Sequence, residues 1–256
     1  MPDPLYPARL VEAFHLAFLR ALEARLDRSC YVVKGGVNLR AWFGSPRYSE
    51  DLDLVVARVG PARLAERVDR LLAGTTLGLL LRSQGLEIGR ASKPKQTETV
   101  QRWKLELRTS GSALPAHTKI EFSRRGLAEG HVLEPVLAEV VRPYGLPAPT
   151  AQHYTAAAAV RQKIRALAGR AQTQARDIWD LDHLFRNTRV DARPLTPDVR
   201  RALAIAVERV RDLPFAHFKA QIVPYLAESV QPLYDSPDSW DRMRELVVDE
   251  LMRLGR

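Results

Sequence analysis

Two aspartates, Asp51 and Asp53, begin the run Asp-Leu-Asp-Leu-Val-Val. The alternation of acidic and apolar residues predicts a β-strand over 51–56 with one end at a solvated site. Side chains two positions apart on a strand point to the same face, with Cα atoms roughly 6.5–7 Å apart. Two carboxylates at that spacing can share divalent cations such as Mg²⁺. The pair therefore predicts a metal site, although such a pair can also be a solvated loop end.

Gly35-Gly36 lies between a β-rich run at 31–33 and a stretch with helical spacing. A glycine pair that opens a helix exposes backbone N–H groups at the positive end of the helix dipole, with no side chain to block a phosphate. Arg47 and Ser49 follow in the turn before the aspartates, and we expect both to bind the same phosphates. The alternative is that all four are ordinary turn residues.

Glu121 alternates with Lys119 and Ser123 on a second predicted strand, over 118–123. It could present a third metal-binding carboxylate if the two strands are neighbours, or it could be a polar residue paired with Lys104 or Lys119. Three carboxylates that bind two hard cations, next to backbone N–H groups that bind phosphate, are what in-line phosphoryl or nucleotidyl transfer requires.

Two longer motifs resemble those of a known family. The first is Lys34-Gly35-Gly36-x-x-Leu39 followed by Arg47-x-Ser49-x-Asp51-x-Asp53, and the second is Lys163-x-x-Ala166-Leu167, Arg170 and Arg176-Asp177-x-x-Asp180-Leu181. Together they resemble the AbiEii/AbiGii-type nucleotidyltransferase toxins, a family that includes the mycobacterial MenT toxins. The resemblance is close over 31–56 and 160–184 and looser elsewhere. Gly-Gly stands where the wider superfamily usually has Gly-Ser, and Glu121 where the third carboxylate is usually an aspartate.

The resemblance implies an α+β fold, in which a DNA polymerase β-like nucleotidyltransferase core with a small mixed sheet precedes an all-helical domain, with the active site in the cleft between them. It implies that Asp51 and Asp53 form the metal centre and that Lys163 and Asp177 are also needed for activity. Lys163 would bind the triphosphate, and Asp177 would orient Lys163 or the acceptor. Asp177 could instead be only a salt-bridge partner of Arg170 or of residues on the same helical turn as Arg176.

Known members of the family add nucleotides to the 3′ end of tRNA, which stops translation, and a cognate antitoxin neutralises them. We therefore expect a Mg²⁺-dependent enzyme that uses a nucleoside triphosphate (NTP), with tRNA and an antitoxin protein as partners. A protein or small-molecule acceptor is the first alternative, and a catalytically silent module that binds RNA or a partner is the second. A P-loop ATPase and a Ser-His hydrolase are disfavoured, because Gly-x4-Gly-Lys-Ser/Thr and Gly-x-Ser-x-Gly do not occur.

The helices and strands that must position these residues fall into two groups along the chain. Three prolines and a glycine within 143–149 predict a linker between the two groups. We expect a nucleotidyltransferase core over 1–142 and a helical domain over 150–256. A further strand is predicted at 103–108, and helices at 8–28, 61–81, 151–168 after a Thr150 N-cap, 171–186, 197–212, 214–228 and 238–254. Residues 90–95 are predicted to form a solvated basic loop that could clamp RNA.

The charge of the chain agrees with a polyanionic partner. Its 256 residues carry a formal net charge of +9. Residues 151–176 contain five Lys or Arg and no Asp or Glu, a composition suited to a triphosphate or an RNA backbone. A single cysteine excludes a disulfide framework, and no apolar run approaches the length of a membrane span. We expect a cytoplasmic protein.

Overall fold

The computed structural model describes residues 6–110, 112–124, 126–127 and 130–256. The chain forms two compact units. Unit 1 comprises Met1–Gly44 and Tyr48–Tyr154, and unit 2 comprises Ser45–Arg47 and Thr155–Arg256. The short segment Ser45–Arg47, which lies within the first motif in the sequence, thus belongs to the same unit as the second half of the chain.

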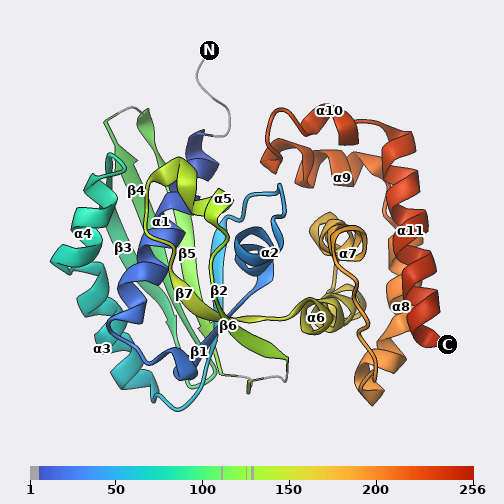
Figure 1. Cartoon of the computed structure of the whole chain (residues 1–256), viewed down its shortest axis with the longest axis horizontal. Coiled ribbons are helices and arrows are strands. Elements are labelled where there is room, and N and C mark those ends of the chain that lie inside the picture. The colour runs from blue at the N-terminus through green and yellow to red at the C-terminus, as the bar shows by residue number, and fades with distance from the viewer. Residues whose placement is uncertain (1–5, 111, 125, 128–129) are drawn as a thin grey trace. The chain divides into compact units, whose positions relative to one another are not determined.

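Unit 1 is built on one mixed sheet, with strand order β3-β4-β5-β2-β1-β7-β6 (Figure 1). In chain order the strands are β1 (Tyr31–Lys34), β2 (Asp51–Val56), β3 (Leu86–Gln96), β4 (Val100–Thr109), β5 (Ser112–Ser123), β6 (His131–Pro135) and β7 (Thr150–Tyr154). β2 pairs with β5 and β1 pairs with β7 in parallel, whereas the other pairings are antiparallel. The predicted α+β class with a mixed sheet is confirmed.

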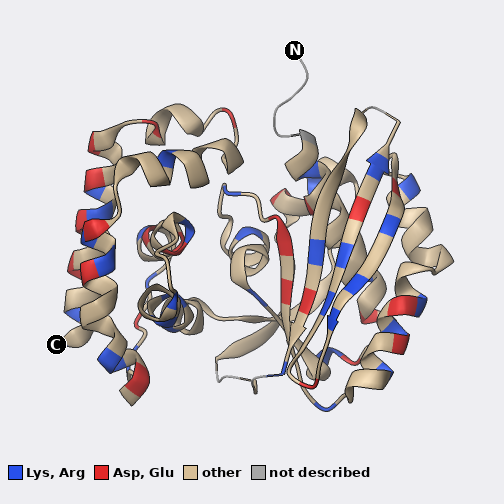
Figure 2. Cartoon of the chain, turned by 180° about the vertical axis from the view of Figure 1, so that it is seen from behind, with Lys and Arg blue, Asp and Glu red and all other residues tan. Residues whose placement is uncertain are grey.

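One face of this sheet packs against helices, because apolar side chains alternate along the strands. On β2, Leu52, Leu54 and Val56 join the buried core. They share that core with α1 (Tyr6–Glu23), α3 (Pro61–Leu72) and α4 (Thr75–Arg82), which lie on this side of the sheet (Figure 1). Asp51 and Asp53 must then point to the opposite face, which is seen in Figure 2. The remaining short helices of unit 1 are η1 (Arg28–Cys30), α2 (Gly35–Phe43), α5 (Ala138–Val141) and η2 (Arg142–Tyr144).

Unit 2 is helical over its described elements. These are α6 (Ala156–Gly169), α7 (Ala175–Asn187), α8 (Pro197–Asp212), α9 (Phe215–Gln221), η3 (Val223–Tyr225), α10 (Gln231–Tyr234) and α11 (Pro237–Gly255). Their apolar faces meet in a core that includes Trp179, Phe218 and Trp240. The Phe218 and Trp240 rings stack with centroids 4.5 Å apart. This packing positions α6 and α7, the two helices that carry the second motif.

The helices predicted over 8–28 and 214–228 end earlier in the structure, at Glu23 and Gln221, and three other predicted elements differ in more than length. Residues 150–154 form strand β7 and not the first turn of a helix, because Val33 and β6 offer this segment strand partners on both sides. The N-cap of α6 is accordingly Thr155, whose hydroxyl accepts from the Ala158 N–H, and not Thr150. The helix predicted over 61–81 is interrupted at Gly74, which caps α4. The basic loop predicted at 90–95 lies within β3, with its side chains exposed.

No helix in the described part of the chain is both long and apolar enough to cross a bilayer.

Candidate active site

The two aspartates of the first motif lie on the central strand β2, between β1 and β5. Asp53 is in register with Lys34 of β1 and Glu121 of β5, and Asp51 is in register with Lys119 of β5. Residues in register on neighbouring strands point to the same face of a sheet. The condition set for Glu121, that its strand should neighbour the strand of the aspartates, is met.

Asp53 is a desolvated carboxylate. Burial raises its pKa, an effect that the charges of Lys34 and Lys119 oppose and those of Asp51 and Glu121 reinforce. Lys119 Nζ lies 2.7 Å from Asp51 Oδ2. Two carboxylates on one face, one of them removed from water, favour the binding of additional positive charge.

Glu121 is held by Arg102 of β4, and not by Lys104 or Lys119. Its Oε2 accepts from Arg102 Nε at 2.7 Å and lies 2.6 Å from Nη2 of the same guanidinium. Within the described residues, no three His, Cys, Asp or Glu side chains are grouped so that they could hold a metal ion. Asp51 and Asp53 have the hard oxygen donors that Mg²⁺ prefers. To bind a metal ion, Asp51 would have to exchange its contact with Lys119, and Glu121 would have to leave Arg102. Its role as a third ligand stays a prediction.

The bare backbone of the glycine pair lies directly beside Asp53. Helix α2 begins at Gly35, which has φ +71°, a left-handed conformation that favours glycine. A Cβ on Gly35 would stand 3.2 Å from Asp53 Oδ2. Lys34, the N-cap residue, makes no side-chain hydrogen bond to the first turn. The N-terminus of α2, with Gly35-Gly36, therefore presents backbone N–H groups next to the carboxylates.

We expect Gly35→Ala to lower the free energy of unfolding by about 1–2 kcal/mol, because a side chain disfavours the left-handed backbone. The added methyl would also crowd Asp53 Oδ2, so the KM for NTP should rise. Thermal unfolding and steady-state kinetics measure the two effects. Gly169→Ala is the matched control, because a Cβ there meets nothing within 4 Å. A loss of stability with the KM for NTP unchanged would show that Gly35 is only a turn residue.

Ser49 and Arg47 are engaged within the protein. The Ser49 hydroxyl donates to the Asp51 carbonyl at 2.9 Å, which braces the turn into β2. Arg47 is buried in unit 2, where its Nη2 donates to Asp180 Oδ1 at 2.9 Å. These contacts give both residues the turn-supporting and structural roles left open as alternatives, while phosphate binding by either stays a prediction.

Four residues of the second motif form a cluster of charges centred on two buried aspartates of α7. Lys163 Nζ lies 2.9 Å from Asp177 Oδ1 and 2.5 Å from Asp180 Oδ2. Arg170 Nε donates to Asp177 Oδ2 at 2.7 Å. Asp177 and Asp180, three positions apart on one helix face, are both fully buried. Asp177 therefore contacts both Lys163 and Arg170, so the orienting contact and the Arg170 salt bridge occur together.

The ionisation of this cluster follows from its pairing. Burial acts to lower the pKa of Lys163, but the carboxylates of Asp180 and Asp177 prevail and raise it. Burial acts to raise the pKa of Asp180, but Arg47 and Lys163 prevail and lower it. Both groups are thus held in their charged forms. The sequence indicates Asp180 only as a motif position, because its contact with Arg47, 133 residues away, leaves no local signal.

Three comparisons with known proteins bear on this arrangement. The sequence matches the family model described as "Nucleotidyl transferase AbiEii toxin, Type IV TA system" over residues 17–253. No curated protein matches the sequence significantly.

Solved structures share the fold at low sequence identity. MenT4, a nucleotidyltransferase toxin from Mycobacterium tuberculosis H37Rv, has a TM-score of 0.62 at 20% identity, over 99% of this chain and 95% of that one. JHP933 from Helicobacter pylori has a TM-score of 0.62 at 19% identity, over 97% and 94%. A putative nucleotidyltransferase from H. pylori has a TM-score of 0.55 at 18% identity, over 100% and 99%.

The family model spans both units and both motifs. The chain therefore belongs to the AbiEii family of nucleotidyltransferase toxins.

Proposed function

We propose that this toxin transfers a nucleoside monophosphate from an NTP to the 3′ end of tRNA, releases pyrophosphate and so blocks translation. The observation that carries the proposal is the apposition of Asp51 and Asp53, on one face of β2, with the side-chain-free backbone at Gly35. Carboxylates for metal ions beside backbone N–H groups for phosphate are what nucleotidyl transfer requires.

The residues of unit 1 would bind and align the nucleotide. Asp51 and Asp53 would hold Mg²⁺, which when bound polarises phosphoryl oxygens and favours the ionised form of the acceptor hydroxyl. The N–H groups at Gly35-Gly36 would receive the phosphates. The 3′ hydroxyl of the acceptor loses its proton to solvent, its oxygen forms a bond to the α-phosphorus as the bond from that phosphorus to the oxygen bridging to the β-phosphorus breaks, and pyrophosphate leaves.

Lys163 is proposed to bind the triphosphate. Its ammonium has three donors, of which two are directed to Asp177 and Asp180. Around it, the three cations Arg47, Lys163 and Arg170 meet two carboxylates, so the cluster keeps one net positive charge. Asp177 would orient Lys163 through the 2.9 Å contact. The Lys163 ammonium is therefore charged and held in place before any ligand binds, which supports its proposed role in binding the triphosphate.

The acceptor is proposed from charge and family. A net charge of +9 and the acid-free stretch 151–176 favour an RNA acceptor. The family description, a toxin of a toxin–antitoxin system, implies a cognate antitoxin as protein partner. Action on tRNA would place the protein in the cytoplasm.

The acceptor is tested by incubating the protein with each α-³²P-labelled NTP, Mg²⁺ and total RNA, and by resolving RNA and protein products separately. We expect label in the tRNA band and its loss with Asp51→Ala. Label on protein alone would contradict the tRNA proposal and favour a protein acceptor. Label transfer that persists in Asp51→Ala would contradict the assignment of the site. If cells that express Asp51→Ala are inhibited as strongly as cells that express the wild-type protein, the catalytically silent binding module would be favoured.

A further inference from the structure

The face of the sheet that carries Asp51 and Asp53 continues outward over β5, β4 and β3, where most of the residues in register with the aspartates are Lys or Arg. Two rows of residues in register run from the acids. One row is Asp51, Lys119, Lys104 and Ser92, and the other is Asp53, Glu121, Arg102 and Lys95. Figure 2 shows this face, with bands of Lys and Arg crossing neighbouring strands beside the acidic strand.

Like charges stand directly opposite each other in both rows. Lys104 faces Lys119 across β4 and β5, and Arg102 faces Lys95 across β3 and β4. Like charges at opposed positions of an antiparallel pair destabilise a sheet. A single such pair is ordinary on a basic protein, but two adjacent pairs concentrate positive potential at one place.

Part of this charge is already balanced. Lys119 is paired with Asp51, and Arg102 is paired with Glu121. By contrast, Lys95, Lys104 and Arg90, the last in register with Glu106 on the same face, have exposed side chains with no ion pair to any described residue. We call Arg90, Lys95 and Lys104 the outer cations. They are free to bind a polyanion.

We infer that the outer cations bind the phosphate backbone of the RNA acceptor and guide its 3′ end toward Asp51 and Asp53. This inference rests on the proposed function, because it takes RNA as the acceptor. From β2 to β3 the face spans three strand spacings, about 14 Å, so that an extended polyanion could cross it. Lys104 and Lys95 stand in the same rows as Asp51 and Asp53, beyond Lys119 and beyond the Glu121–Arg102 pair, and Arg90 stands in the next row with Glu106. A backbone bound to the outer cations is therefore directed along these rows toward the proposed metal site.

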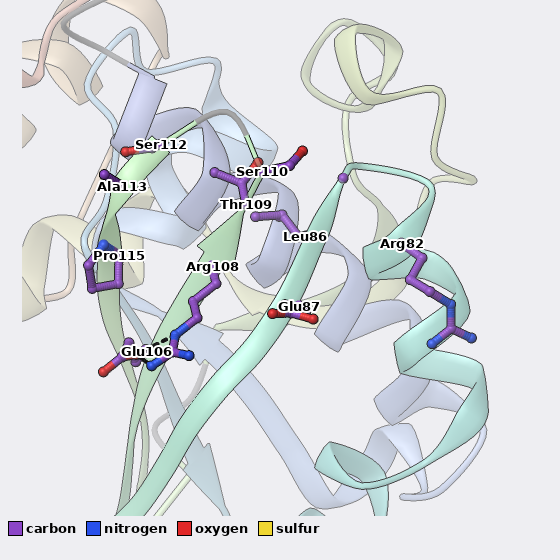
Figure 3. A pocket seen from close by; sticks show the side chains of 11 residues that line it. Arg82, Leu86, Glu87, Glu106, Arg108, Thr109, Ser110, Ser112, Ala113 and Pro115 are labelled. Atoms are coloured by element: carbon purple, nitrogen blue, oxygen red, sulfur yellow. Dashed lines mark hydrogen bonds and ion pairs between the residues drawn. The ribbon is translucent and has the colours of Figure 1, made fainter.

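A hollow of about 640 Å³ lies next to Arg90, because its lining includes Glu106, the residue in register with Arg90 (Figure 3). It lies along the same strands, and its charged lining consists of Arg82, Arg108, Glu87 and Glu106. Arg108 is paired with Glu106 at 2.7 Å. Two arginines and two glutamates leave the hollow without net charge, so a phosphate backbone is favoured over the outer cations and not within the hollow.

The test compares two triple variants of the full chain. The first, R90Q/K95Q/K104Q, removes the outer cations. The second, R200Q/R201Q/R242Q, removes the same charge from exposed arginines of unit 2 and is the matched control. Binding of a fluorescein-labelled tRNA transcript is measured by anisotropy over a series of salt concentrations without NTP, and steady-state kinetics are measured with tRNA and NTP. None of the six residues belongs to the proposed catalytic site.

We expect R90Q/K95Q/K104Q to weaken tRNA binding about tenfold or more and to reduce the salt slope by about 0.7–0.9 for each phosphate that the variant no longer neutralises. The KM for tRNA should rise, with the KM for NTP and kcat unchanged. The thermal midpoint should not fall, because the variant removes opposed like charges. The control should retain most of the binding.

The inference is overturned if both triple variants bind tRNA equally, since net charge alone would then explain the binding. It is also overturned if R90Q/K95Q/K104Q labels tRNA with an unchanged KM, a result that leaves the proposed function intact. If the wild-type protein binds tRNA through the outer cations but transfers no nucleotide to it, the proposed function fails while the binding face stands.

Discussion

Asp51→Asn and Asp53→Asn are each expected to lower the rate of nucleotidyl transfer about a thousandfold. Each change keeps the shape of the side chain and removes the charge that would hold Mg²⁺. The transition-state stabilisation supplied by a bound metal is several kcal/mol, and each 1.36 kcal/mol corresponds to a factor of about ten. The measurement is kcat with saturating NTP and tRNA. Glu106→Gln, which removes an acid from the same face of the sheet, is the control and should keep full activity.

Asp53→Asn should lose activity without any loss of thermal stability. Because burial raises its pKa, the folded protein binds this proton more tightly than the unfolded chain does. The ionised carboxylate therefore costs stability as pH rises above its ordinary pKa of 3.8. A neutral asparagine removes that cost, so the thermal midpoint of Asp53→Asn at neutral pH should equal or exceed that of the wild-type protein. A much lower midpoint would mean that the activity is lost through unfolding.

Lys163→Met is expected to destabilise unit 2 by about 3–5 kcal/mol, because it leaves Asp177 and Asp180 buried with less compensating charge. Urea unfolding followed by circular dichroism measures this change. Arg165→Met on the same helix is the control: its partner Asp198 is half exposed, and such surface pairs contribute at most about 1 kcal/mol. Similar losses for both variants would contradict the view that the buried cluster stabilises the unit.

The pH dependence of the same cluster has a defined sign. The lowered pKa of Asp180 gives stability that is present above pH 3.8 and is lost as pH falls through the depressed value. The raised pKa of Lys163 gives stability that is present below pH 10.5 and is lost as pH rises through the elevated value. The contribution of the cluster to the free energy of unfolding should thus be constant between pH 3.8 and pH 10.5. Lys163→Met should abolish the alkaline part of the dependence.

Local patterns predict those parts of the fold in which one face is buried and the other is solvated. The alternation from Asp51 to Val56 identifies β2 with its observed bounds, and the helical spacing from Pro197 to Asp212 does so for α8. Such patterns do not identify β7, because its five residues adjoin the alanine-rich start of α6 and its strand conformation depends on pairing with Val33 and β6, which are distant in sequence. They also favour a loop where β3 lies, because Gly89 and Pro94 interrupt its pattern, at register shifts that only the paired strand reveals.

The candidate site is predictable as a set of residues but not as a set of contacts. The two aspartates share a face because of spacing alone, whereas the register of Glu121 beside Asp53 depends on a parallel pairing that no local pattern encodes. The Arg102 partner of Glu121 follows from the β4–β5 register in the same way. The family motif indicates Lys163 and Asp177. Their burial with Asp180 and Arg47 requires the packing of α6 against α7 and of Ser45–Arg47 into unit 2.

The most direct test of the central claim is to supply tRNA, Mg²⁺ and the purified protein with NTP labelled either on the α- or on the γ-phosphorus. We predict that the α-label enters the tRNA, that the γ-label leaves as pyrophosphate, and that neither event occurs with Asp51→Asn. Transfer of the γ-label to any acceptor, or α-label transfer undiminished in Asp51→Asn, would contradict nucleotidyl transfer at this pair of aspartates.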